Sequence, residues 1–392
     1  MKQRSSLNRR HFLRIVGAAP LALRTSVARG LPSSPRLAYV GSGCGEIYVF
    51  QIDGPNWTLM QIVACKAPAS LTVHPNRRIL YAVNQVASHQ HLPTGSVETF
   101  TLAPDGRLAA FSKTSLSLSA TLPRHLALSP DGKRAVVAIH GGGAYNLLTF
   151  LDGGLRPQIT GILKESGCGP TALHQLSAHP SMALFDTTQS RVLTSDTGSD
   201  RISVFAVNET SLTVHQRFAT DAGSGPAHLL LHPKGDILFV ANQLNCSLCS
   251  YKYDPERGRI LHCIQCIAED TGGPLALHPS GRTLYTTGGS EDDVIQAWHI
   301  DRTTGRLNRL QSWHQPSARS VAITAERNTL LVVSDTLDGV LRFAAEPADG
   351  RLHPPHWQQK SPNHSVSQHS PTPYNSGLQI RDTKEQDEPE AT

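Results

Sequence analysis

Short apolar segments separated by turn residues recur along most of this chain. In residues 223–255, a short apolar segment (228–231) is followed by the turn His232-Pro233-Lys234-Gly235, a second apolar segment (237–241) and a third (247–253). Proline, glycine and small polar residues supply the backbone angles that a tight antiparallel reversal needs. The pattern therefore predicts consecutive antiparallel β-strands joined by tight turns.

The same pattern occurs six times. The turns after the first strands align as His74-Pro75-Asn76, Ser129-Pro130-Asp131, Asp186-Thr187-Thr188, His232-Pro233-Lys234, His278-Pro279-Ser280 and Thr324-Ala325-Glu326. Their central residues are 55, 57, 46, 46 and 46 residues apart. Each turn precedes an apolar second strand, a third strand and, after a glycine-containing hairpin turn, a fourth strand. Four strands repeating at about 40–50 residues indicate the blades of a β-propeller, because a β-sandwich would not keep so regular a period.

The two ends of the repeat region predict a seventh blade. Residues 37–40, 47–52 and 60–64 match the second, third and fourth strands of a blade, and residues 371–380 can supply the missing innermost strand. Closing the ring with both ends of the chain removes exposed sheet edges. We therefore expect an all-β fold, a seven-bladed propeller of four-stranded antiparallel blades over residues 35–381.

The segments outside the propeller have different compositions. Residues 8–14 (NRRHFLR) form a twin-arginine pattern, followed by a weakly apolar run and small residues at 26–28. We expect residues 1–28 to be a signal for export to the periplasm or the cell exterior; the alternative is an ordinary basic tail. Residues 382–392 are acidic and poor in apolar side chains, which is typical of a disordered tail.

Charge and apolar runs exclude two classes of partner. Residues 1–28 contain six basic and no acidic residues, so removing them changes the formal net charge from +5 to −1. The basic isoelectric point then gives no evidence for nucleic-acid binding. No apolar run reaches the ~18 residues of a membrane span. A redox role is disfavoured because the Cys-x-x-Cys-His haem motif is absent. We expect a monomer without cofactor, metal or nucleic acid.

Four of the seven cysteines form two Cys-x-x-Cys pairs, at 246/249 and 263/266. This spacing occurs in zinc sites. Residues three apart on a strand point to opposite faces, however, so four sulfurs around one metal would require a bulge. The hairpin predicts that Cys249 faces Cys263 and that Cys246 faces Cys266. Zinc, one or two cross-strand disulfides, and buried free thiols all remain open, and an exported protein can keep a disulfide.

Ligands of propellers usually bind at the mouth of the central channel, near the starts of the innermost strands and the loops after the second strands. Aligning the repeats places there a first set of residues, Ala69, Arg124, Pro180, Ala227, Gly273 and Arg319. Beside them stand Ser70, His125, Ser181, His228, Pro274 and Ser320. A further set follows the second strands: Gln85, His140, Asp196, Gln243, Gly289 and Asp335. By contrast, His74, His232 and His278 occupy turns, where we expect local hydrogen bonds rather than metal binding.

Several phrases in these blades carry a family resemblance. They are GPAHLLLHPKGDILFVANQL, TLPRHLALSPDGKRAVVAIHGGG, LFDTTQSRVLTSDTGSDRISVF and SPTPYNSGL. The chain resembles the lactonase family of seven-bladed propellers over about residues 37–380; the family includes bacterial 6-phosphogluconolactonase and fungal carboxy-muconate lactonising enzymes. The family pattern Gly-Pro-Arg-His, with a later Asn-Glu, has Ala227 and Gln243 here. The family's His-x-His phrase is His179-Pro180-Ser181, and Arg319 matches a later family arginine.

These replacements bear directly on the implied reaction. A lactone hydrolase needs one group to bind the substrate anion and another to activate water. Alanine cannot supply the guanidinium fork of arginine, and glutamine cannot accept a proton as glutamate does. Arg124 occupies the same place in its blade as Ala227 in its own, so the positive charge can have moved around the ring.

We therefore expect a lactonase-type hydrolase that opens a sugar-acid lactone at the channel mouth. The candidate catalytic residues are His179, Asp196 and His228, and the candidate substrate-binding residues are Arg124, His125, His140, Gln243 and Arg319. The alternative roles are structural: Asp196 ties a turn and His228 packs internally. The alternative function is a non-catalytic propeller that binds an anionic small molecule or a protein partner.

Overall fold

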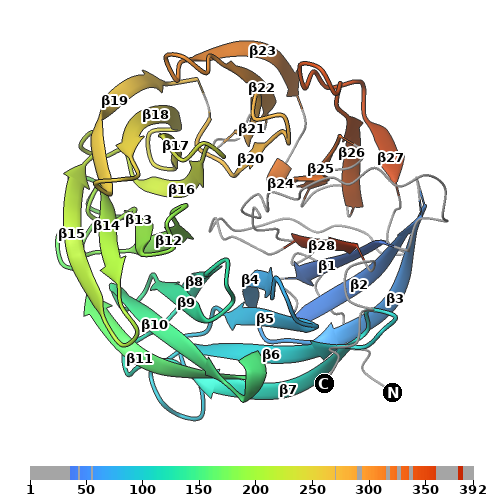
Figure 1. Cartoon of the computed structure of the whole chain (residues 1–392), viewed down its shortest axis with the longest axis vertical. Helices are drawn as coiled ribbons and strands as arrows, with labels where there is room; N and C mark the ends of the chain where they lie inside the picture. Colours follow the sequence, from blue (N-terminus) through green and yellow to red (C-terminus); the bar gives the residue numbers. More distant parts are fainter. Residues whose placement is uncertain are drawn as a thin grey trace, which may run out of the picture.

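The computed structural model describes residues 36–42, 45–53, 56–269, 271–288, 294–314, 318–324, 328–334, 339–358 and 378–382. These residues form seven sheets, each of four antiparallel strands. The sheets stand around a common axis as the blades of a propeller, with one strand of each blade nearest the centre (Figure 1). The predicted fold class is confirmed. Residues 1–28 and 383–392, the expected signal and most of the expected tail, lie outside the described residues.

The strands follow the chain from blade to blade, and within each blade they are ordered from the centre outward. Blade one comprises β28 (Leu378–Asp382), β1 (Arg36–Ser42), β2 (Glu46–Asp53) and β3 (Asn56–Ala64). Blade two comprises β4 (Pro68–Val73), β5 (Ile79–Asn84), β6 (Ser96–Leu102) and β7 (Leu108–Ser115). Blade three comprises β8 (Pro123–Leu128), β9 (Arg134–Ile139), β10 (Ala144–Leu151) and β11 (Arg156–Lys164), with the short 3-10 helix η1 (Asp152–Gly154) in its last turn.

The remaining four blades have the same order. Blade four comprises β12 (Pro180–Phe185), β13 (Arg191–Asp196), β14 (Arg201–Val207) and β15 (Leu212–Ala219). Blade five comprises β16 (Pro226–Leu231), β17 (Ile237–Asn242), β18 (Ser247–Asp254) and β19 (Arg259–Ile267). Blade six comprises β20 (Leu275–Leu277), β21 (Thr283–Thr287), β22 (Val294–Ile300) and β23 (Leu307–His314). Blade seven comprises β24 (Ala318–Thr324), β25 (Thr329–Ser334), β26 (Gly339–Ala344) and β27 (His356–Gln358).

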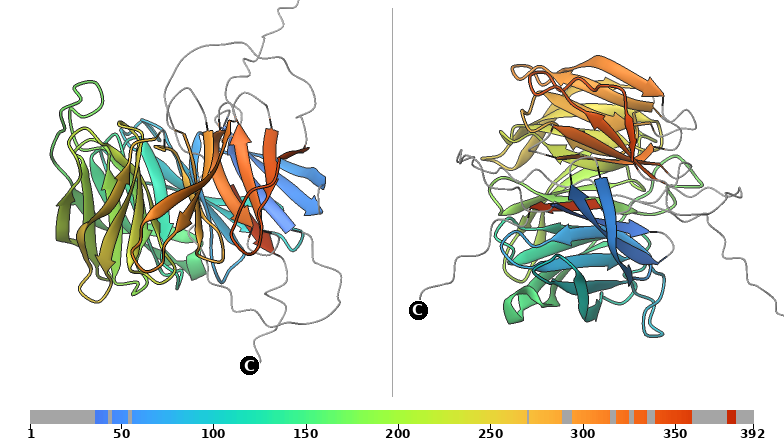
Figure 2. Two further views of the ribbon diagram at one scale, coloured as in Figure 1. Left: turned by 90° about the horizontal axis from the view of Figure 1, so that it is seen from above. Right: turned by 90° about the vertical axis from the view of Figure 1, so that its right-hand side faces the viewer.

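Blade one joins the two ends of the chain. Strand β28 pairs antiparallel with β1, with Leu378 opposite Val40 and Asp382 opposite Arg36. The views in Figures 1 and 2 place red β28 beside blue β1. The innermost strand of this blade thus comes from the C-terminal region, as the sequence predicted. Residues 371–377, the first part of the expected closing segment, lie outside the described residues.

Burial explains the strand pattern within each blade. The second strands β5 and β17 are buried at all six positions, because each packs against neighbouring blades on both faces. The outer strands β7 and β15 each begin with a buried leucine and are otherwise largely exposed. The apolar cores lie between blades; one of them joins Leu184 and Val204 of blade four to Leu238 and Val240 of blade five. A blade therefore depends on its neighbours to bury its faces.

Polar contacts also tie neighbouring blades together. A tyrosine in the second strand of one blade donates a hydrogen bond to a glycine carbonyl in the last hairpin turn of the next, as Tyr39 does to Gly106 (2.9 Å) and Tyr81 to Gly154 (2.7 Å). Turn histidines form the expected local bonds. The imidazole Nδ1 atoms of His74, His232 and His278 accept hydrogen bonds from backbone N–H groups two residues later, at 3.1, 3.2 and 3.2 Å.

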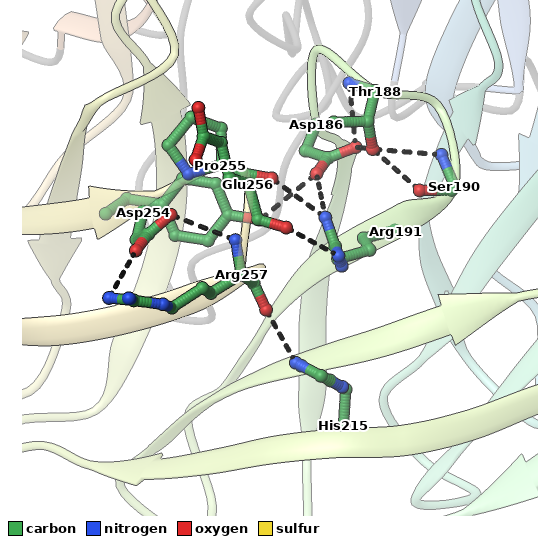
Figure 3. A network of polar contacts seen from close by, with 10 residues as sticks. Asp186, Thr188, Ser190, Arg191, His215, Asp254, Pro255, Glu256 and Arg257 are labelled. Atoms are coloured by element: carbon green, nitrogen blue, oxygen red, sulfur yellow. Dashed lines mark hydrogen bonds and ion pairs between the residues drawn. The ribbon is translucent and has the colours of Figure 1, made fainter.

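A network of such contacts joins blades four and five (Figure 3). Arg191 donates to the carbonyl oxygens of Pro255 (2.8 Å) and Glu256 (3.1 Å), and its Nη1 lies 3.7 Å from Asp186 Oδ2. The same Asp186 oxygen accepts the hydroxyl of Tyr253 at 3.1 Å. A side-chain Cβ at residue 258 would collide with Arg191 Nε, so glycine is required where this turn meets the guanidinium.

The cysteine pairing differs from the prediction. Cys249 forms a disulfide with Cys266, while Cys263 lies opposite Tyr251 and is a free thiol. Two bulges in the β18–β19 hairpin, at Ser250/Tyr251 and Lys252/Tyr253, shift the register that an uninterrupted hairpin would have. Cys246 precedes β18 and takes no part in this disulfide; its Sγ donates to the Gln243 carbonyl oxygen at 3.9 Å. Among the described residues, no three His, Cys, Asp or Glu side chains are placed to hold a metal ion.

The described part of the chain contains no helix with the length and apolar character needed to cross a lipid bilayer.

Candidate functional site

Five of the inner strands share a β-bulge at the same place. In β4, β8, β12, β16 and β24, the first residue pairs with the end of the second strand, and pairing resumes two residues later. The residues left between are Ala69, Arg124, Ser181, Ala227 and Arg319. In four of these strands the preceding residue is proline, which has no N–H to donate to a ladder. Because a bulge re-aims the side chain that it carries, it gives each of these blades one equivalent position near the axis.

The bulges correct the predicted alignment of blade four. The residue equivalent to Arg124 is Ser181, not Pro180, because Pro180 pairs with Asp196 as Pro123 pairs with Ile139. The residue after the second strand is therefore Thr197, and Asp196 ends that strand. The repeat spacing contains this information, since Gln85, His140, Thr197 and Gln243 each stand ten residues after the centre of their turn.

Asp196 is buried, with 4% of its surface exposed, and organises the turn around it. Its Oδ1 accepts hydrogen bonds from the backbone N–H groups of His179 (2.7 Å), Gly198 (2.9 Å) and Ser199 (3.2 Å). Burial raises the pKa of this carboxyl, although the three backbone hydrogen bonds oppose that effect. The carboxylate thus fixes the backbone of His179 rather than approaching the other histidines directly.

His179 and His140 form a stacked pair. Their rings are 4.5 Å apart between centroids and inclined by 26°. His179 Nδ1 lies 3.0 Å from the carbonyl oxygen of His140. Because a carbonyl only accepts hydrogen bonds, Nδ1 carries the proton, and the neutral ring has its lone pair on Nε2. His179 is therefore held in the tautomer that a general base at Nε2 requires.

Arg124 connects blade three to blade four. It is 7% exposed, and its Nη1 donates to Ser181 Oγ at 3.4 Å. Ser181 Oγ is also 3.2 Å from the His179 carbonyl oxygen and forms a short hydrogen bond with Thr197 Oγ1. Thr197 in turn donates to the carbonyl oxygen of Pro226 at 3.1 Å in blade five. Sequence reasoning missed Thr197 because of the one-residue error in alignment.

Three histidines near Arg124 are neutral at pH 7. Burial, followed by the Arg124 charge, lowers the pKa of His228 to about 4. Burial and the neighbouring His228 lower the pKa of His125 to about 3. Burial, followed by Arg124 and His179, takes the pKa of His140 well below its usual value. The cluster therefore combines one permanent cation with neutral imidazoles, which can donate or accept hydrogen bonds.

Most of the chain matches a known protein family. The family model described as "Lactonase, 7-bladed beta-propeller" matches residues 38–367.

This chain belongs to the lactonase family of seven-bladed propellers.

Other members and structural neighbours are distant in sequence. The chain is 21% identical to the 6-phosphogluconolactonase of Bacillus subtilis, over 81% of this chain and 93% of that protein. It is 23% identical to the 6-phosphogluconolactonase of Yersinia enterocolitica, over 76% and 87% of the two chains. Its fold is similar to the solved periplasmic gluconolactonase of Pseudomonas aeruginosa, with a TM-score of 0.74 and 21% identity over 88% and 99% of the two chains.

The arginine of the lactonase pattern described in the sequence falls at one of the bulge positions. The arginine of its Gly-Pro-Arg-His phrase corresponds to Ala227, at the bulge of blade five, whereas Arg124 stands at the bulge of blade three. The Arg124 charge nevertheless acts on His228 of blade five. A cation from blade three thus influences the part of the cluster where the family arginine is absent.

Two predicted site residues are not joined to this cluster by any described contact. Gln243 donates its backbone N–H to the Gly225 carbonyl oxygen at 2.8 Å, and no hydrogen bond links its side chain to the described histidines. Arg319 belongs to β24, but its side chain lies outside the described part of the chain, as do Gly289 and Asp335. The described cluster therefore consists of Arg124, His125, His140, His179, Ser181, Thr197 and His228.

Proposed function

We propose that this protein is an exported lactonase-type hydrolase that opens a sugar-acid lactone at the cluster around Arg124 and His179. The observation that carries the proposal is the hydrogen bond from Arg124, at the bulge of blade three, to Ser181 of blade four. The charge of Arg124 also lowers the pKa of His228 in blade five. The contact between Arg124 and Ser181 supports the proposal, because it joins a guanidinium to the group that contains His179, the residue matching the family's His-x-His phrase.

The chemistry follows from the protonation states of the cluster. His179 Nε2 accepts a proton from a water molecule as the water oxygen bonds to the lactone carbonyl carbon. The Arg124 guanidinium stabilises the oxyanion that forms, and neutral His228 and His125 can hydrogen-bond the sugar hydroxyls. The ring C–O bond then breaks, and the proton on His179 passes to the departing ring oxygen, which leaves a hydroxy acid. Asp196 acts as a positioning residue through the backbone of His179.

Export and substrate are part of the same proposal. The twin-arginine pattern and the Cys249–Cys266 disulfide support an oxidising compartment outside the cytoplasm. The periplasmic gluconolactonase with the same fold favours an unphosphorylated sugar lactone, while the 6-phosphogluconolactonase relatives favour a phosphorylated one. Both substrates present the same lactone carbonyl to His179.

The test is a lactone panel assayed with residues 29–392 purified after export. Acid release from glucono-δ-lactone, galactonolactone and 6-phosphogluconolactone is followed above the spontaneous rate. We expect turnover of at least one lactone. We also expect kcat/KM to fall about 100-fold in Arg124→Gln and kcat to fall at least about 100-fold in His179→Asn. Lys133→Gln, an exposed change in a turn outside the cluster, is the matched control and keeps full activity.

Two results would contradict the proposal. One is the absence of turnover for every lactone, and the other is full activity in Arg124→Gln. The replacement of the family arginine and glutamate by Ala227 and Gln243 favours a second candidate, a propeller that binds an anionic small molecule without hydrolysing it. Thermal stabilisation by a lactone or its acid, with no product formed, would support this second function.

A further inference from the structure

A cavity lies in blade two, apart from the histidine cluster. Its volume is about 240 Å³, and its walls include Lys66, Asn84, His89, His91, Ser96 and Lys113. Asn84 ends β5 and Ser96 begins β6, so the cavity opens at the end of the propeller where the inner strands begin. Lys113 belongs to the outermost strand, β7, which places the cavity farther from the axis than the bulge residues.

The lining carries an excess of positive charge. Lys113 Nζ pairs with Glu98 Oε2 at 2.9 Å, and that same oxygen lies 3.5 Å from Asn84 Nδ2. Lys66 is exposed at the cavity and makes no ion pair with any described carboxylate. The carboxylate of Glu98 thus stands against the two lysines, Lys66 and Lys113, that line the cavity. A small anion would meet a net positive charge together with the amide of Asn84 and the hydroxyl of Ser96.

His89 has a buried nitrogen that lacks a partner. Its Nε2 is shielded from solvent and forms no hydrogen bond with any described residue. Burial, followed by the charges of Lys113 and Lys66, lowers the pKa of this imidazole, and Glu98 opposes that effect. An anion bound in the cavity that His89 lines would offset this repulsion, because its negative charge favours the protonated imidazole.

The segment that carries these histidines is held in a costly conformation. His89 and Leu92 exchange backbone hydrogen bonds, both of 3.0 Å, across a two-residue turn. Gln90 and His91 in this turn have φ of 50° and 65°, where glycine or asparagine is usual. Non-glycine residues are strained in this region of backbone angles. The turn keeps His89 and His91 at the cavity in spite of that cost.

We propose that this cavity binds a small dianion of the oxyanion class, such as a phosphate ester or a dicarboxylate, between Lys66, His89 and Lys113. The site does not depend on the proposed lactonase activity. A cavity of this size accommodates a ligand of only a few heavy atoms beyond the anionic group. Lysine ammonium groups act as point charges toward such an anion, and Asn84 and Ser96 add directional hydrogen bonds.

The experiment is calorimetric titration of residues 29–392 with sodium sulfate, whose charge is constant over the pH range used. Ionic strength is held constant with chloride. We expect one site in the intact protein, and an affinity at least about tenfold lower in the double variant Lys66→Gln/His89→Gln. Lys133→Gln, which removes an exposed lysine outside the cavity, and Arg124→Gln, which alters the histidine cluster, are the controls and keep the sulfate affinity.

Proton uptake gives a second readout. Lys66, Lys113, Glu98, His91 and the Cys65 thiol are the other titratable groups around His89. We expect tighter sulfate binding at pH 5.5 than at pH 7.5, with proton uptake that is smaller in His89→Gln than in the intact protein. Titrations with inorganic phosphate and with malonate then separate phosphate-ester from dicarboxylate ligands.

Three outcomes would overturn the inference. They are the absence of sulfate binding, unchanged binding in Lys66→Gln/His89→Gln, and loss of binding in Arg124→Gln alone. Lactone turnover in the double variant is expected to equal that of the intact protein. Failure of the anion site and failure of the proposed hydrolase can therefore be told apart.

Discussion

His125 is the clearest example of a residue whose charge is controlled by its surroundings. It is 7% exposed, neighbours His228, and its Nδ1 forms no hydrogen bond with a described residue. In the unfolded chain its pKa is close to 6.5, whereas burial lowers the pKa in the folded protein to about 3. Between these values the unfolded state binds a proton that the folded state does not, so stability rises with pH.

We predict that His125 costs the protein stability in mild acid. The contribution is absent above pH 6.5 and reaches up to about 2–3 kcal/mol by pH 4.5. His125→Gln removes it, so the difference in unfolding free energy between pH 7.5 and 4.5 becomes smaller by that amount. Urea unfolding at several pH values measures the effect. His215→Gln, a change at an exposed histidine, is the control; equal pH dependence in His125→Gln and the intact protein would contradict the prediction.

The sequence predicted most members of the histidine cluster but not how they are connected. Arg124, His125, His140 and His228 stand at repeat positions near the axis, which spacing alone reveals, whereas His179 was found through the resemblance to the family's His-x-His phrase. The tautomer of His179 depends on the carbonyl of His140, a contact between blades that no local pattern encodes. The roles of Ser181 and Thr197 emerge only once the bulge in β12 sets the register.

The turns between strands also contact the neighbouring blade, and these contacts contribute to the stability of the propeller. Arg191, at the start of β13, is 20% exposed and lies between Asp186 and the β18–β19 turn (Figure 3). It satisfies two turn carbonyls and faces a carboxylate that is fully buried. Removing the guanidinium leaves that carboxylate with neutral partners only, which is costly in a buried setting.

We predict that Arg191→Ala lowers the free energy of unfolding by about 2–3 kcal/mol, because two carbonyls and one carboxylate lose a donor. Chemical denaturation followed by fluorescence measures the change. Arg257→Ala is the matched control in the same network. Its side chain is 79% exposed and contacts Asp254 at 3.4 Å, so the expected change is within about 0.5 kcal/mol. Equal effects of the two substitutions would show that the contact between blades contributes nothing beyond surface charge.

Hairpin register shows where sequence patterns stop being sufficient. The turn glycines and apolar runs place β18 and β19 correctly, yet the two bulges between them decide which cysteines face each other. A bulge adds one residue to one strand without changing the hydrophobic pattern. The sequence left a disulfide open beside zinc and free thiols, and the pairing of Cys249 with Cys266 became known only from the paired strands.

At the scale of the whole molecule, the repeat period predicted the architecture because each blade needs the same two neighbours. Tyrosine-to-glycine hydrogen bonds and the apolar cores between blades recur around the ring. A period in the sequence therefore corresponds to a repeated interface, and counting periods counts blades. The closure of blade one required a different argument: a ring with no open sheet edge needs one strand from the far end of the chain.

Ring closure leads to the last prediction. Without β28, strand β1 has an open edge beside β4 of the next blade, and blade one loses the strand that pairs with residues 36–40. Open edges favour pairing with other chains. We therefore expect a chain ending at residue 377 to melt on the order of 5 °C or more below the full protein and to associate in size-exclusion chromatography. A chain ending at Asp382 retains β28 and is the matched control, with an unchanged melting temperature. If both truncated chains have the melting temperature of the full protein, blade one is held in the ring by packing against its neighbours and not by β28.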